Sequence, residues 1–83
     1  NAVKHPKASI LLAIDENNDI WLDKRVIDPR AIKANIARMR AETPDGEVIV
    51  QADIESNAET LMKVVDALKE AGIPLPTVST KSE

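Results

Sequence analysis

Two short apolar segments on either side of a polar turn predict a β-hairpin near the start of the chain. Residues 9–14 place Ile10, Leu12 and Ile14 on one face of a strand, and 20–22 form a second apolar strand. The polar residues 15–19 between them are mostly Asp and Asn, which are typical of turns. A second turn at 23–25 leads to a short third strand at 26–27.

The apolar spacing then changes to three and four residues, which predicts a helix. Asp28 and Pro29 are a favourable start, because an Asp side chain caps free backbone N–H groups and proline is accepted at the first helical position. The helix ends before the turn at 43–46. It places three apolar residues on one face: Ile32, Ile36 and Met39.

The second half of the chain predicts a strand, a helix and a last strand. Residues 47–52 have a β-branched centre and indicate an interior strand. Ser56 followed by Glu59 fits a capping box, so we expect Ser56 to cap the second helix. Gly72 is a favourable residue just after a helix, and a short strand follows around 77–80. The apolar face of this helix carries Leu61, Val64, Val65 and Leu68.

The predicted order is β-β-(β)-α-β-α-β, an α+β fold. We expect two amphipathic helices on one face of a small mixed sheet, with strands separated by a helix running parallel. At 83 residues the chain has room for one small domain, which we assign to 9–83. The polar residues 1–8 read as a flexible linker.

Composition excludes several kinds of function. The net charge of −3 and a single aromatic residue, Trp21, argue against nucleic-acid binding. Without cysteine there is neither a disulfide nor a thiolate metal site. His5 stands alone in a polar segment, and the acidic residues of 15–19 lack the EF-hand order, so no metal is expected. No cofactor motif is present, since Gly46 and Gly72 are the only glycines.

Catalysis is also unsupported, because no serine has a plausible base partner in the sequence. Asp53, at the end of the interior strand, is interpreted as a loop carboxylate that accepts backbone N–H bonds. The fragment is therefore expected to fold without metal or cofactor, and it is not expected to be an enzyme.

Two surfaces are candidates for binding partners. If the helices cover one face of the sheet, Leu11, Ala13 and Trp21 point to the other face, which predicts a homodimer. The last strand follows Pro76 and is expected at a sheet edge, where an extended peptide can add a strand. Its residues are Thr77, Val78, Ser79 and Thr80. Val78 is the expected apolar contact, unless it belongs to the core.

The segment 51–73 resembles the C-terminal half of the ExbD/TolR family. The family has a strand ending in Ala-Asp, here 52–53, and a helix of the form Leu-Met-x-Val-Met-Asp-x-Leu-x-x-Ala-Gly, here 61–72. The resemblance covers about 9–80. It implies the periplasmic domain of a single-pass inner-membrane protein of a Gram-negative bacterium, whose transmembrane helix, expected before this chain, conducts protons and meets an ExbB-like motor subunit.

The resemblance further implies a non-enzymatic interaction module with a TonB-like protein as its partner. Residues 59–64 look most like the ExbD branch. The alternative is a TolR-like domain of the Tol-Pal system, which would bind peptidoglycan. A small metabolite-binding regulatory domain is a third interpretation, which would require a polar pocket or a Gly-rich helix start.

Overall fold

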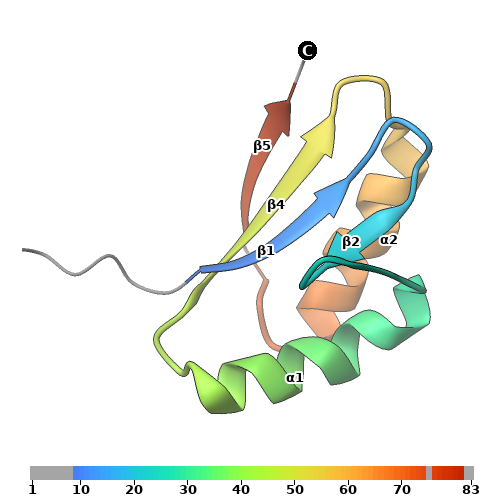
Figure 1. Cartoon of the computed structure of the whole chain (residues 1–83). Helices are drawn as coiled ribbons and strands as arrows, with labels where there is room; N and C mark the ends of the chain where they lie inside the picture. Colours follow the sequence, from blue (N-terminus) through green and yellow to red (C-terminus); the bar gives the residue numbers. More distant parts are fainter. Residues whose placement is uncertain (1–8, 75, 82–83) are drawn as a thin grey trace, which may run out of the picture.

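The first three strands form an antiparallel meander. The computed structural model describes residues 9–74 and 76–81, so the predicted linker 1–8 lies outside the described residues. Strand β1 (Ser9–Ile14) pairs with β2 (Ile20–Leu22), which pairs with β3 (Arg25–Ile27). All three strands are predicted by the sequence, and Figure 1 shows β1 and β2.

Two further strands complete a five-stranded mixed sheet in the order β3-β2-β1-β4-β5. Strand β4 (Glu47–Asp53) lies beside β1 and β5 (Thr77–Lys81) lies beside β4, both in parallel pairing. Only β2 therefore runs against its neighbours. The expectation of parallel strands across each helix is confirmed.

Both helices lie on the same side of this sheet (Figure 1). Asp28 caps the first, as predicted: its Oδ1 accepts the Arg30 N–H at 2.8 Å. The first turn is a short 3₁₀ segment, η1 (Pro29–Ala31), which continues into α1 (Ile32–Glu42). The second helix is α2 (Ala58–Glu70).

The predicted cap of α2 is wrong by one residue. Asn57 is the N-cap, and its side-chain oxygen accepts the Thr60 N–H at 2.9 Å. Ser56 instead donates its hydroxyl to the Asp53 carbonyl at 2.6 Å, because the chain turns tightly between β4 and the helix. The backbone N–H of Asn57 is held by the Asn18 side chain at 2.8 Å, which ties the β1–β2 turn to the start of α2.

The end of α2 follows the prediction. Gly72 has φ +90°, a conformation that glycine adopts readily. Its N–H donates to the Lys69 carbonyl, and the next N–H, of Ile73, donates to the Leu68 carbonyl. These two bonds form a Schellman motif, which satisfies carbonyls that the last helical turn leaves free.

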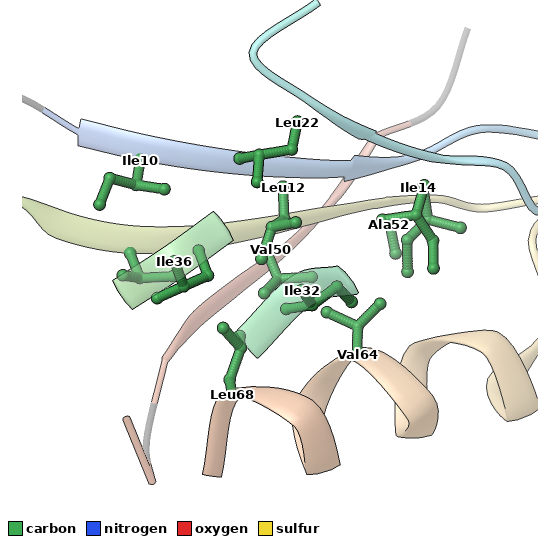
Figure 2. Close-up of a cluster of buried hydrophobic side chains, with 12 residues drawn as sticks. Ile10, Leu12, Ile14, Leu22, Ile32, Ile36, Val50, Ala52, Val64 and Leu68 are labelled. Atoms are coloured by element: carbon green, nitrogen blue, oxygen red, sulfur yellow. The ribbon is translucent and has the colours of Figure 1, made fainter. Parts of the chain in front are cut away.

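The core lies between the sheet and the helices (Figure 2). It is wholly aliphatic, as the near absence of aromatic residues requires. Its buried residues are Ile10, Leu12, Ile14, Ile20, Leu22, Ile32, Ile36, Val48, Val50, Ala52, Val64 and Leu68. Met39 and Leu61 pack against this cluster, which confirms the predicted face of α1 and three of the four residues predicted for α2. The fourth, Val65, is half-buried but is not among the residues packed against the core.

Candidate partner-binding surfaces

Strand β5 lies at an edge of the sheet, as the sequence predicts. Within the described residues it pairs only with β4, and each of its residues is exposed. The opposite edge, β3, is only three residues long, against five in β5. An edge strand presents unpaired backbone groups, so β5 is the longer template for strand addition.

The hydrogen bonds of β5 show which backbone groups point outward. The Lys81 carbonyl accepts the Ile54 N–H at 2.8 Å, so the backbone polar groups of Lys81 point toward β4. Because this direction alternates along a parallel strand, Thr77 and Ser79 also bond inward. The N–H and C=O groups of Val78 and Thr80 therefore point away from the sheet. Of the four predicted residues, these two offer backbone bonds to a partner.

Val78 is not part of the buried core. It pairs with Val50, which places its side chain on the helix side of the sheet, yet 46% of its surface is exposed. Val78 is exposed because β5 is an edge strand and has a neighbouring strand on one side only. The interpretation of Val78 as a core residue is thus unsupported. Thr77 is fixed from the other face by a hydrogen bond to the Glu47 carboxylate at 2.9 Å.

The face of the sheet opposite the helices, here called the open face, carries the residues predicted for dimerisation. Trp21 lies between Ala13 and Val26 in the strand register. Leu11 lies beside Ile49 of β4. Val26 and Ile49 were not predicted for this face. The side of the sheet to which a two-residue strand points its side chains cannot be assigned before the strand register is known. The same holds for the strand that lies beside β1. Leu11, Trp21 and Val26 are exposed, so the structure leaves an apolar surface here.

The Trp21 side chain is anchored at one end. Its indole N–H donates to Asp15 Oδ2 at 2.9 Å. The other oxygen of Asp15 accepts the backbone N–H groups of Asn17 and Asp19, both at 2.9 Å. These bonds favour the charged carboxylate, and the bond from Trp21 contributes most to holding the pKa of Asp15 below its usual value. The 15–19 segment is a hydrogen-bonded turn, as predicted.

Other charged side chains serve the local fold. Arg30 pairs with Asp28 at 3.0 Å, and chiefly this side-chain hydrogen bond lowers the pKa of Asp28 to about 2. Asp53 accepts the Glu55 N–H at 2.8 Å, which agrees with its predicted role. In the part of the chain that the structure describes, no group of three or more possible ligands is placed to bind a metal ion. No helix among the described residues is long and apolar enough to span a membrane.

Comparisons with known proteins agree on one family. The family model for biopolymer transport protein ExbD/TolR matches residues 1–83, the full chain. The chain is also similar to biopolymer transport protein exbD2 of Vibrio cholerae, with 37% identity over 73 residues. That alignment covers 88% of this chain and 54% of the relative, so the chain spans about half the length of the protein it matches.

Proposed function

This chain belongs to the ExbD/TolR family of biopolymer transport proteins, and we propose that it is the periplasmic domain of an ExbD-like accessory in a proton-driven TonB complex. In this proposal the domain is not an enzyme. It meets a TonB-like protein and thereby supports active transport across the outer membrane. Anchoring in the inner membrane, and contact with an ExbB-like motor subunit, belong to a transmembrane helix outside this domain.

The ExbD branch is supported over the TolR branch by two observations. The relative from Vibrio cholerae carries the name exbD2. The residues 59–64 of this chain also resemble ExbD more than TolR. Peptidoglycan binding, which the TolR branch implies, therefore stays the alternative that the experiment below must distinguish.

The observation that carries the proposed partner contact is the exposed edge of β5. Val78 and Thr80 direct backbone N–H and C=O groups outward, at the spacing that an added strand requires. The exposed side chain of Val78 lies beside these groups, on the helix side of the sheet. An extended peptide gains affinity from such backbone bonds and specificity from alternate side chains. TonB-like proteins have long, extended, proline-rich periplasmic regions, which suit this kind of binding.

An amide-shift titration with peptides from the periplasmic region of a TonB-like protein tests the proposal. We expect the largest shifts at 77–80. Val78→Pro removes an outward N–H without touching the bonds to β4, and proline is tolerated on the solvent side of an edge strand. This variant should therefore lose most of the binding and keep its fold. Val78→Ala is the matched comparison, since it retains the N–H and trims only the side-chain contact, so it should lose less binding than Val78→Pro.

Three results would count against the proposal. Shifts confined to the 15–19 turn or to the helices would exclude docking on β5. Equal binding by the proline and alanine variants would exclude backbone pairing at Val78. Shifts with soluble peptidoglycan fragments, in the absence of any with the peptides, would favour the TolR-like alternative.

A further inference from the structure

The backbone of β5 imposes an alternation on any strand that is added to it. Val78 and Thr80 are the residues of 77–81 whose N–H and C=O groups point outward. In antiparallel pairing, the added residue directly opposite each of them exchanges both hydrogen bonds with it. The added residue opposite Ser79 directs its own N–H and C=O groups away from β5. Bonded and unbonded residues therefore alternate along the added strand.

The bonded residues of the added strand also share one face of the sheet. Residues directly opposite each other on neighbouring strands carry their side chains on the same face. Val78 and Thr80 pair with Val50 and Ala52 of the core, so both lie on the helix side. The bonded residues of the added strand consequently point their side chains toward the helices. The unbonded residue opposite Ser79 points to the other face.

The helix side of the β5 edge is flanked by α2. On one flank of this helix, Lys63 and Ala67 lie beside Pro29 and Arg30 of η1. Strand β3 is one edge of the sheet and η1 follows it directly in the chain, so this flank faces the β3 side. The opposite flank of α2 therefore faces the β5 edge.

The flank of α2 toward β5 carries an apolar surface that the core leaves uncovered. Val65 and Ala67 occupy equivalent positions on either side of the buried stripe of the helix. Ala67 packs against the core, whereas Val65 is half-buried and does not. Met62, on the same flank as Val65, is 52% exposed. Val65, Met62 and Val78 together are here called the edge patch.

We propose that the β5 site selects, from the proline-rich region of its partner, a segment in which apolar residues alternate with prolines. This inference rests on the proposed function, because it concerns the peptide that is added to β5. The bonded residues need an N–H group, which proline lacks, and their side chains meet the edge patch. The unbonded residues need no inward N–H, and proline is tolerated in an edge strand where the N–H side faces solvent.

Proline at every second position also prepares the peptide for binding. A residue that precedes proline is restricted to extended conformations. Each apolar residue of such a segment is therefore extended before it reaches β5, and this lowers the entropy that is lost on binding.

The orientation of the added strand determines where the apolar side chains go. In parallel pairing, the outward groups of Val78 bond to the two residues on either side of the one opposite it. Those residues point away from the helices, so an apolar-proline repeat would turn its apolar side chains away from the edge patch. Antiparallel pairing is the more stable arrangement per residue, and it is the one we expect.

Synthetic peptides of equal length test the inference, one a Val-Pro repeat and the other a Ser-Pro repeat. Neither can slip by one residue, because proline would then occupy a bonded position. In an amide-shift titration followed at 77–80, the Val-Pro repeat should have a dissociation constant about tenfold lower, since only its side chains bury apolar surface on the edge patch. A Val-Pro-Pro repeat is the control for spacing. Its apolar residues are three apart, so it cannot bond to both Val78 and Thr80 and should bind more weakly.

A variant of α2 locates the apolar contact. Val65→Ser should remove most of the preference for the Val-Pro repeat and leave the affinity for the Ser-Pro repeat unchanged. Val26→Ser is the matched control, because Val26 is 51% exposed but lies on β3, at the other edge of the sheet. This control should keep the full preference. The amide of Val65 and the methyl group of Met62 should shift with the Val-Pro repeat and stay unchanged with the Ser-Pro repeat.

The results separate this inference from the proposed function. Equal affinity of the Val-Pro and Ser-Pro repeats at 77–80 would overturn the inference while docking on β5 stands. So would equally tight binding of the Val-Pro-Pro repeat, or a preference that persists in Val65→Ser while circular dichroism shows a folded variant. If peptides from a TonB-like protein shift 77–80 but no repeat does, the inference alone fails. If no peptide of either kind shifts 77–80, the proposed function fails with it.

Discussion

At the scale of single residues, the carboxylate of Asp15 connects the β1–β2 turn to the open face. It accepts the Trp21 indole N–H and two backbone N–H groups. Replacement by asparagine turns one acceptor oxygen into an amide donor. Either the bond from the Trp21 indole or the bonds from the two backbone N–H groups are then lost. We expect Asp15→Asn to weaken the near-UV circular dichroism of the single tryptophan. The control is Asp19→Asn, because the Asp19 carboxylate accepts no hydrogen bond within the described residues.

The pKa shift of Asp15 gives the same contact a defined pH dependence. Its pKa in the folded chain is below the usual value of 3.8. The charged carboxylate thus contributes stability that is fully present above the unfolded pKa and is lost as pH falls through the folded pKa. The tryptophan signal should be constant from neutral pH to about pH 4 and change only in stronger acid. A change centred between pH 5 and 7 would contradict this assignment.

Two valines that pair across β4 and β5 differ in burial, because one lies in the core and the other at the sheet edge. Val50 is fully buried, whereas Val78 is 46% exposed. We expect Val50→Ala to lower the free energy of unfolding by about 2 kcal/mol, from lost burial and the cavity left behind. Val78→Ala should cost less than about 1 kcal/mol. Urea unfolding measures both values, and equal losses would mean that Val78 is covered in solution.

At the scale of elements, the caps of α2 make a further prediction. Asn57 satisfies the Thr60 N–H, so Asn57→Ala should lower the free energy of unfolding by about 1 kcal/mol. Asn57→Ser should retain most of that stability, because serine also caps helices well. Thermal or urea unfolding of the two variants checks this. If the serine variant loses as much as the alanine variant, the cap is not what Asn57 supplies.

The elements themselves were largely predictable because their signals are local. Apolar segments on either side of the polar turn 15–19 indicated β1 and β2, and Gly72 marked the end of α2. The start of α2 was predicted one residue early because Ser56 and Asn57 are both good capping residues. What decides between them is tertiary: the Asn18 side chain bonds the Asn57 N–H from 39 residues away in the chain. A local pattern carries no information about such a contact.

At the scale of the whole molecule, strand order determines the candidate surfaces. The sequence predicted an edge position for β5 and an uncovered sheet face, and the structure has both. It did not reveal that β4 lies beside β1, which adds Ile49 to the open face, or which residues of β5 point their backbone outward. Both depend on register between distant segments.

The geometry of the whole sheet predicts that its two candidate surfaces act independently. Leu11 and Val78 lie two strands apart, about 10 Å, and their side chains point to opposite faces. Effects of substitutions at such separations usually add. Leu11→Lys should therefore weaken self-association and leave the peptide titration at β5 unchanged. Val78→Pro should do the reverse, and the double variant should lose both activities while it stays folded. Sedimentation and amide shifts, measured on all three variants, separate the two activities. Should Leu11→Lys weaken peptide binding as strongly as Val78→Pro does, dimerisation would be a precondition for the peptide site, and the two surfaces would form one.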